Sequence, residues 1–161
     1  MVFGDDVVVF SDKEITWSNH PDPNVSWARW YRKAGHKSVE QFRGAERWIS
    51  SYPDRIFTDP ECSQRLPVEL PPAGRMSIHG VVIALGAAEA CRAYFGGNDG
   101  ELIIASNVRG EDHFHPTESS MLPFSVGDVD PTVRFVHVFD DTALDLAARV
   151  RHRPRFRPVP T

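Results

Sequence analysis

The pattern of apolar and polar positions is most regular in the second half of the chain. Apolar residues recur there with a period of about 3.6 residues, which is typical of a helix with one buried face. Ser77 can cap the first turn of this helix, and Gly96-Gly97 can end it. The pattern therefore predicts a core helix over residues 77–95. Its apolar positions are Ile78, Val81, Val82, Leu85, Ala88, Cys91 and Phe95.

Three short β-rich runs and a final helical pattern follow this predicted helix. The runs are ELIIAS, LPFSV and TVRFVHVF, and the polar stretch SNVRGEDHFHPTESS connects the first two. A helix is expected over about residues 143–152, and a flexible tail rich in arginine and proline over residues 153–161. Helix, strand, loop, strand, strand and helix in this order predict an α/β fold with a mixed sheet packed on helices.

A hairpin and a proline-rich connection frame the first half of the chain. VVVFSDKEITWS is typical of a β-hairpin, and its two β-rich runs place the turn at Ser11-Asp12-Lys13. Residues 52–75 contain five prolines, too many for a continuous helix or strand. We therefore expect a hairpin at the N-terminal end of the first half of the chain, and a surface loop over residues 52–75 at its other end.

Two helices are predicted between the hairpin and the loop. From Asn24 onward, tryptophan and tyrosine recur at i, i+3 and i+4, which places three aromatic rings on one helical face: Trp27, Trp30 and Tyr31. Ser38 and Gln41 form an S-x-x-Q capping box, and apolar residues continue after it at helical spacing. This second pattern predicts a helix over about residues 39–51.

Length, composition and charge favour one soluble domain. A chain of 161 residues can bury a single core, and 41% apolar with 25% charged residues is typical of globular proteins. The net charge of −4 comes from interleaved acids and bases, so neither a broad basic face nor a nucleic-acid partner is predicted. The apolar stretch 78–95 contains Glu89 and Arg92, so no membrane span is predicted. The acidic start MVFGDD and the absence of a C-x-x-C motif favour a cytoplasmic location.

Several segments, taken in order, resemble the C-terminal half of the polyketide-associated acyltransferases. They are FRGAERW, SIHGVVIALGAAEACRAYFGG, ELIIASNVRGEDHFHPTE and LPFSVGDVDPTVRF. That family shares its superfamily with nonribosomal peptide condensation domains, and its fold is built from two chloramphenicol-acetyltransferase-like halves. The matching motif positions are Ser77, His79 and Gly80 in the predicted helix, Val108-Arg109 after the strand, and Pro116-Thr117-Glu118 in the next loop.

The resemblance implies a domain organisation and a function. Residues 76–152 would form one acyltransferase-like half, with residues 1–75 as a lead-in and 153–161 as a tail. The chain would transfer an acyl group from a CoA or carrier-protein thioester to a hydroxyl or amine, in natural-product or lipid assembly. The H-H-x-x-x-D-G motif of the family's other half is missing before residue 76. A partner half or a self-dimer is therefore expected, with a carrier protein as a further candidate partner and no resident cofactor.

Two other classes of function stay open at this point. A half cut from a two-domain enzyme leaves an apolar face, which would suit a non-catalytic module that binds a partner subunit or a carrier protein. A small stand-alone cyclase or isomerase would use the fold only as a pocket. Likeness of fold alone does not establish any of these reactions.

His137 and Asp141 form an H-x-x-x-D arrangement at the end of the last predicted strand. A neutral imidazole there could take a proton from a hydroxyl or amine, with the carboxylate fixing its tautomer. However, Val136 and Thr142 replace the family's first histidine and its glycine, and the segment aligns with a non-catalytic strand. The alternative is a strand histidine followed by an acidic helix cap at Asp140 or Asp141.

Four further residues are candidates for structural or metal-binding roles. His79, in the first turn of the predicted helix, would be neutral and hydrogen-bonded. Arg109 resembles the arginine that buttresses the family's C-terminal half, which would pair with a carboxylate. His113 and His115 would point to one side of a strand, as zinc or iron requires. No third ligand has a reliable spacing, so these two are weak candidates and no metal site is predicted.

Overall fold

A four-stranded mixed sheet forms the centre of the computed structural model, which describes residues 1–97, 100–115 and 122–143. Its strand order is β1 (Val2–Phe3), β2 (Asp6–Glu14), β3 (Ser77–Leu85) and β6 (Val136–Phe139). β1 runs antiparallel to β2, whereas β2, β3 and β6 are parallel. The predicted α/β class, with a mixed sheet and an N-terminal hairpin, is confirmed.

The hairpin turns at a different place from the one predicted. β1 and β2 are joined at Gly4 and Asp5, and Gly4 has a φ of +61°, which glycine adopts without strain. The predicted turn at Ser11-Asp12-Lys13 is wrong, because β2 runs straight through these residues. β2 stays extended there because it pairs with β3 along all nine of its residues.

The predicted core helix over residues 77–95 is also wrong in its first half. Ser77–Leu85 is strand β3, and only Ala88–Phe95 is helical (α3). Gly86 separates the two elements with a φ of +100°. β3 lies between two parallel neighbours, β2 and β6, and is buried without interruption from residue 80 to residue 84. Such a strand has a continuous apolar run rather than an alternating one, so it resembles the buried stripe of a helix.

Both predicted helices of the first half are confirmed, and they form one continuous helical segment. Helix α1 (Pro23–Tyr31) leads through a π-helical turn, η1 (Arg32–His36), into helix α2 (Lys37–Ser51). Asp22 caps α1 by accepting a 2.8 Å hydrogen bond from the backbone N–H of Asn24. The capping box predicted at Ser38 and Gln41 does not form, because the chain is already helical when it reaches Ser38.

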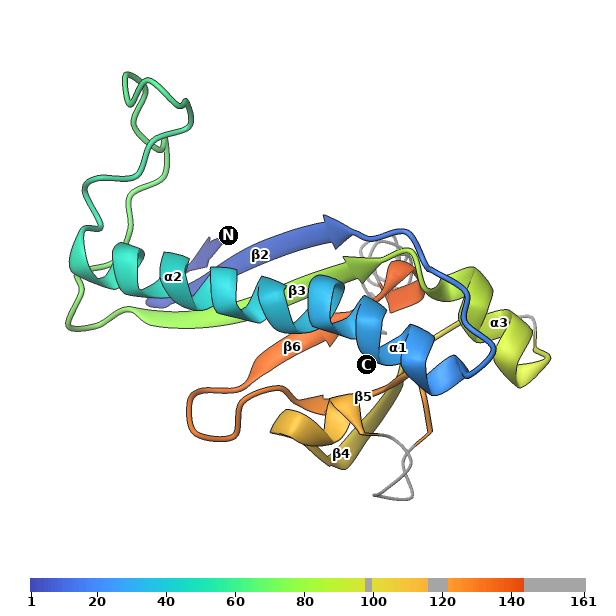
Figure 1. The fold of residues 1–161 in the computed structure, drawn as a ribbon. Helices are drawn as coiled ribbons and strands as arrows, with labels where there is room; N and C mark the ends of the chain where they lie inside the picture. The colour runs from blue at the N-terminus through green and yellow to red at the C-terminus, as the bar shows by residue number, and fades with distance from the viewer. Residues whose placement is uncertain (98–99, 116–121, 144–161) are drawn as a thin grey trace, which may run out of the picture.

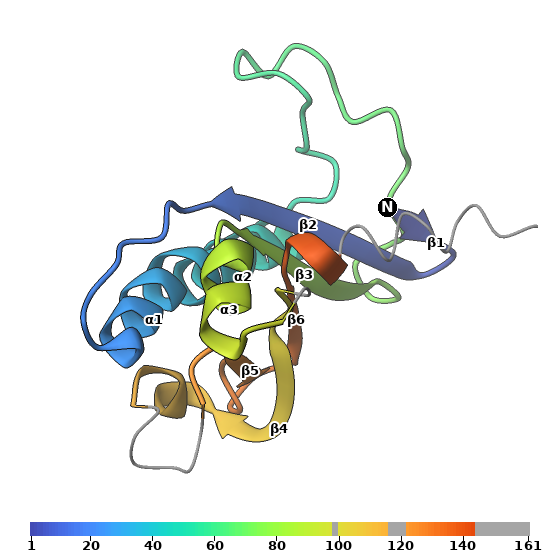
Figure 2. The same cartoon turned by 90° about the vertical axis from the view of Figure 1, so that its right-hand side faces the viewer.

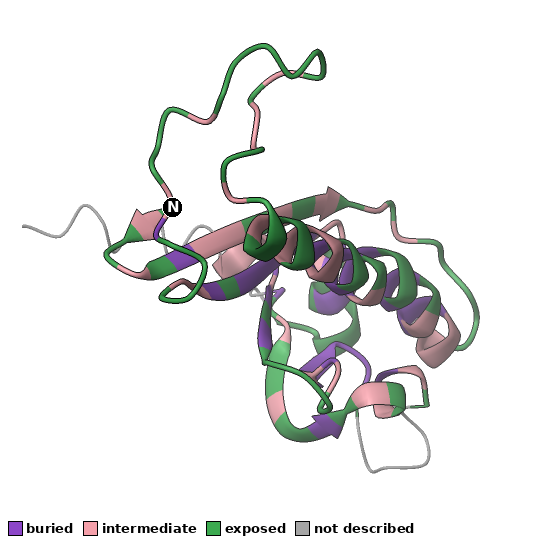
Figure 3. Cartoon of the chain, turned by 90° about the vertical axis from the view of Figure 1, so that its left-hand side faces the viewer, coloured by how far each residue is buried: buried purple, intermediate pink, exposed green. Residues whose placement is uncertain are grey.

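Helices α1 and α2 cover one face of the central sheet (Figure 1). The phenyl ring of Phe42 on α2 lies where Gly80 of β3 has no side chain; a Cβ there would be 2.5 Å from the ring. Figure 3 shows the buried residues along the inner side of the helices and on the strands beneath them. The largest buried side chains are Trp27, Tyr31, Phe124 and His113.

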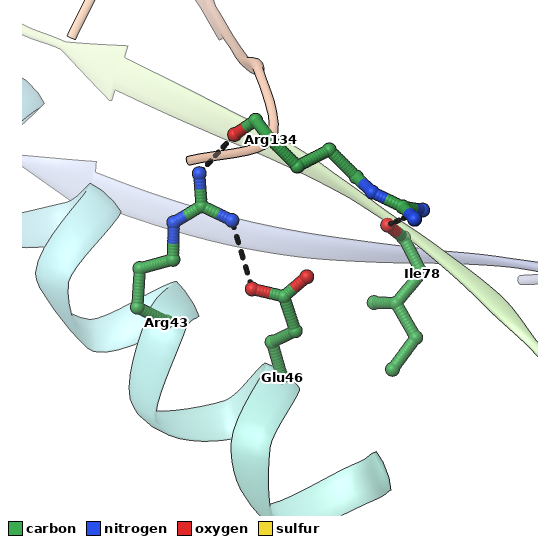
Figure 4. A network of polar contacts seen from close by, with 4 residues as sticks. All are labelled: Arg43, Glu46, Ile78 and Arg134. Carbon is green, nitrogen blue, oxygen red and sulfur yellow. Dashed lines mark hydrogen bonds and ion pairs between the residues drawn. The ribbon is translucent and has the colours of Figure 1, made fainter. Parts of the chain in front are cut away.

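Arg43 connects α2 to the segment before β6, which is distant in sequence (Figure 4). One of its terminal nitrogens donates a 2.8 Å hydrogen bond to Glu46, and the other donates to the backbone carbonyl of Arg134. The guanidinium of Arg134 in turn donates to the carbonyl of Ile78 at 3.2 Å. This network holds the approach to β6 between α2 and β3.

A second, two-stranded sheet lies beside the first one (Figure 2). It pairs β4 (Ile103–Arg109) in parallel with β5 (Ser125–Asp128), and the short 3₁₀ helix η2 (Gly110–Phe114) follows β4. β4, β5 and β6 confirm the three strands predicted for this region. The predicted tail over 153–161 lies outside the described residues, as does all but the first residue of the helix predicted over 143–152.

The proline-rich connection forms an arm that projects from the body of the molecule (Figures 1 and 2). It contains neither a helix nor a strand over residues 52–75, as predicted, although Phe57 and Arg65 form an isolated antiparallel bridge. At its tip the carboxylate of Asp59 accepts hydrogen bonds from the backbone N–H groups of Ser63 and Gln64. The arm thus links α2 to β3 through a loop with local order.

Candidate functional site

The face of the central sheet that points away from α2, here called the outer face, combines apolar side chains with two histidines. Successive side chains of a strand point to opposite faces, and Gly80 faces α2, so odd-numbered residues of β3 lie on the outer face. The strand register then aligns two rows across β2, β3 and β6: Phe10, Val81 and His137, and Asp12, Ile83 and Phe139. Val8 pairs with His79 across β2 and β3, and Phe135 directly precedes β6. Phe10 and Phe135 are 47% and 46% exposed.

The structure pairs His79 with Asp6 on this face. The Nε2 atom of His79 lies 2.8 Å from a carboxylate oxygen of Asp6, and both side chains are about half exposed. The parallel register places the two residues on the same face, one strand apart and two positions offset. The sequence predicted His79 in the first turn of a helix, and this location is wrong. His79 lies on strand β3, where a carboxylate orients its ring.

The structure does not bring His137 and Asp141 together. The ring of His137 is exposed on the outer face, between Phe135 at 5.0 Å and Phe139 at 5.9 Å (centroid distances). The carboxylate of Asp141 instead accepts a hydrogen bond from the backbone N–H of Gly86 at 3.3 Å. In this arrangement the carboxylate that would fix the tautomer of His137 has a different partner.

Asp140 has the capping role that was the structural alternative for this segment. It is buried and accepts hydrogen bonds from the backbone N–H groups of Ala143 at 2.9 Å and Leu102 at 2.5 Å. It thereby joins the end of β6 to the start of β4. Burial, with a smaller contribution from Asp140, raises the pKa of the nearby Cys91 thiol to about 11, so this cysteine stays protonated and unreactive.

The two candidate metal ligands do not share a side of a strand. His113 and His115 belong to η2 and the residue after it, and His113 is buried whereas His115 is exposed. Both ring nitrogens of His113 are occupied: Nδ1–H donates to the carbonyl of Gly110 at 2.7 Å, and Nε2 accepts from the N–H of Gly127 at 3.1 Å. Within the described ranges, no group of three or more His, Cys, Asp or Glu side chains could hold a metal ion.

His113 makes the stability of the protein depend on pH. Burial lowers the pKa of its imidazole below the ordinary value of about 6.5, so the unfolded chain takes up a proton that the folded chain excludes. The free energy of unfolding is therefore expected to fall below pH 6.5, by at most about 1.4 kcal/mol per pH unit. Urea unfolding between pH 7.5 and 5 measures how the free energy of unfolding changes with pH. A His113→Gln variant should lose the part of this change that comes from His113.

A side-chain NMR titration provides the control for this prediction, because it reads His113 in the folded protein. The ring nitrogens of His113 should keep the shifts of a neutral imidazole at pH 6.5, where half of a free histidine side chain is protonated. Protonation of His113 at or above pH 6.5 would contradict the prediction.

Arg109 ends β4 on the surface. Its backbone N–H donates to the carboxylate of Asp112 at 3.1 Å. In the part of the chain that the structure describes, no carboxylate forms an ion pair with its guanidinium. The motif positions Pro116-Thr117-Glu118 lie outside the described residues.

Two sets of polar residues in the structure were missed by the sequence analysis. Asp6 could not have been assigned to His79, because the pair spans 73 positions and depends on the register of two strands. The second set is four basic residues around a groove beside Ile15, which we call the basic groove: Arg29, Arg32, Lys33 and Lys37. These residues are spaced at i, i+3, i+4 and i+8, which places them on one face of a helix. The sequence alone could therefore have indicated this group.

Comparison with known proteins adds no family to these observations. No protein-family model, curated protein or solved structure matches the chain. Among residues 1–97, 100–115 and 122–143, no helix is both long and apolar enough to cross a membrane.

Proposed function

We propose that the protein transfers acyl groups on the outer face of its central sheet, with His79 as the general base. The 2.8 Å contact between His79 and Asp6 carries this proposal, because it supplies the orienting carboxylate that His137 lacks. Asp6 is a positioning residue: it holds the ring and stabilises the imidazolium that forms when a proton is taken up. In this proposal the base of the reaction that the acyltransferase resemblance implies is His79 and not His137.

The proposed reaction needs one proton acceptor. If Nε2–H of His79 donates to Asp6, Nδ1 keeps a lone pair that can accept the proton of a hydroxyl or amine. The oxygen of this hydroxyl, or the nitrogen of this amine, then attacks the carbonyl carbon of a thioester. A C–O or C–N bond forms, the C–S bond breaks, and the imidazolium returns the proton to the departing thiolate.

The neighbours of His79 suit the acyl part of such a substrate. Phe10 and Val81 lie one row along the sheet from His79, and Phe135 packs against His137 of the same row at a centroid distance of 5.0 Å. Because apolar side chains with a few polar groups are typical of small-molecule sites, this face could bind a hydrocarbon chain next to the base. The thioester would be carried by CoA or by a carrier protein.

A second chain would complete the site. Phe10, Phe135 and His79 are exposed on the outer face, although Val81 and Ile83 beside them are buried. Acyl transfer requires that water be kept from the thioester. A partner half or a second copy of this chain would cover the face. We propose this assembly together with the reaction.

Replacing His79 with glutamine is expected to lower the rate of thiol release from an acyl-CoA by at least about 100-fold, since general bases contribute 10²- to 10⁴-fold. Release of free thiol is followed with a chromogenic disulfide, using acyl chains of several lengths and an alcohol or amine acceptor. Asp6→Asn should cause a smaller loss, and His20→Gln is the matched control. If His137→Gln abolished turnover and His79→Gln did not, the base would be His137.

The exposed aromatic residues of the outer face also favour a second candidate function. Phe10 and Phe135 stand out from a sheet face that α1 and α2 do not cover, which is typical of an association surface. A non-catalytic module would use this face to bind a partner subunit or carrier protein. In that case His79→Gln changes neither thiol release nor the mass of the assembly. The double variant Phe10→Ser/Phe135→Ser, by contrast, reduces the mass of the assembly in light scattering.

A further inference from the structure

The basic groove lies at the other end of β2 from the proposed acyl-transfer site. Asp6 begins β2, whereas Ile15 follows its last residue and forms one wall of the groove. The opposite wall is the continuous helical segment α1–η1–α2. The groove has a volume of about 220 Å³ and contains two hydroxyl groups, those of Thr16 and Ser18, and the side chain of Trp30.

None of the described residues that line this groove is acidic, although the protein as a whole has a net charge of −4. Across the described residues, none of the four basic side chains forms an ion pair. By contrast, Arg43 and Arg75 elsewhere on the surface are paired with carboxylates at 2.8 and 2.9 Å. Arg32 also lies over the ring of Phe114, at 4.9 Å from its centroid. Four positive charges that form no ion pair with a described residue therefore surround one small hollow.

The helix gives no structural reason for this concentration of charge. Arg29, Lys33 and Lys37 are spaced by four, and like charges at this spacing repel each other on a helix. Cations are favoured near a helix C-terminus, but these residues lie in the first half of a segment that continues to Ser51. An anion held between them would remove the repulsion.

The π-helical turn η1 brings these charges closer to one line. In an α-helix, residues spaced by four drift by about 40° around the axis at each step. A π-helical turn is wider, with hydrogen bonds from i to i+5, so it removes part of this drift between Lys33 and Lys37. π-Helical turns are often found at functional sites.

We propose that the basic groove binds the phosphate group of a small phosphate-bearing ligand. Arginine and lysine donate charge-assisted hydrogen bonds to phosphate oxygens, and the hydroxyls of Thr16 and Ser18 supply two neutral donors. The exposed acids Glu14 and Glu40 flank the groove along the chain, so the positive region is short. A nucleic-acid backbone requires a longer basic stripe, and one phosphate or diphosphate group does not.

Titration with inorganic pyrophosphate and inorganic phosphate, measured by isothermal calorimetry at low salt, tests this proposal. Lys33 and Lys37 line this groove and not the neighbouring hollow around Asp22, which Arg29 and Arg32 also reach. The double variant Lys33→Gln/Lys37→Gln is therefore expected to weaken pyrophosphate binding by at least about ten-fold. Arg47→Gln, an exposed arginine further along α2, is the matched control and should change the affinity by less than two-fold.

Three results would overturn the proposal. The first is the absence of binding for both anions, and the second is equal affinity of the wild-type protein and the double variant. The third is a short DNA duplex that displaces pyrophosphate and binds far more tightly than either small anion, since this would indicate a polymer site. Weaker binding of phosphate than of pyrophosphate supports a diphosphate ligand, whereas similar binding supports a single phosphate group.

Discussion

Replacing Gly86 with alanine is expected to lower the free energy of unfolding by about 4 kcal/mol. Two effects add at this position. The φ of +100° is a conformation that costs a side-chain-bearing residue about 1–3 kcal/mol. A Cβ would also lie too close to the carbonyl oxygen of Ile15. This oxygen belongs to the backbone and cannot move aside as the end of a flexible side chain can, so such overpacking costs about another 1–3 kcal/mol. Urea unfolding followed by circular dichroism measures the loss.

Gly44→Ala is the matched control for Gly86→Ala. Gly44 lies inside α2, has a normal helical backbone, and a Cβ there would meet no atom within 4 Å. Alanine is the better helix former, so this substitution should stabilise the protein by about 0.5–1 kcal/mol. If both substitutions changed the stability equally, the turn between β3 and α3 would not have the described conformation.

Replacing Trp27 with alanine should cost about 3–5 kcal/mol, the usual penalty for removing a large aromatic side chain from a core. Trp27 is fully buried, and its ring packs against Trp30, Tyr31 and Phe124 at centroid distances of 5.3 to 5.5 Å. Its indole N–H donates a 3.1 Å hydrogen bond to the carbonyl of His113, so its loss also leaves a buried acceptor without a partner. Thermal and urea unfolding measure the change.

Trp48 provides the comparison on the same helical segment. Its side chain is 51% exposed and contacts mainly Tyr52 and the carbonyl of Arg55. Trp48→Ala should therefore cost less than about 1 kcal/mol. Trp27→Phe serves as a milder variant that keeps an aromatic ring in the core, and an intermediate loss is expected for it. Equal losses for Trp27 and Trp48 would contradict the described core.

The sequence predicted the helices well and the inner strand poorly, for a physical reason. The helix through Trp27 and Tyr31 has one buried face, so its 3.6-residue period is visible in the chain. β3 is buried on both faces, so the run from Gly80 to Ala84 has no period that separates a strand from a helix. The β-branched residues within it, and the glycines at 80 and 86, were the available signals for a strand.

The candidate sites also differ in how well the sequence alone can predict them. The basic groove depends on helical spacing, and that spacing can be recognised in the sequence once a helix is predicted. The pair of His79 and Asp6 depends on which residue of β2 lies beside which residue of β3, and register is a property of the folded sheet. His137 and Asp141 were close in sequence, yet a strand end directs the histidine to the sheet face and the acid toward Gly86.

The parallel pairing of β2 with β3 also determines the order in which the protein can assemble. Asp6 pairs with Ser77, so the helical segment and the whole arm lie within the loop that this pairing closes. Contacts between such distant residues form slowly, because loop entropy is lost before any pairing is gained, whereas α1 and α2 need only local contacts. A refolding chain should therefore regain its helical circular dichroism before it regains the acyl transfer that we propose, and the delay between the two signals would measure the time that the central sheet takes to close.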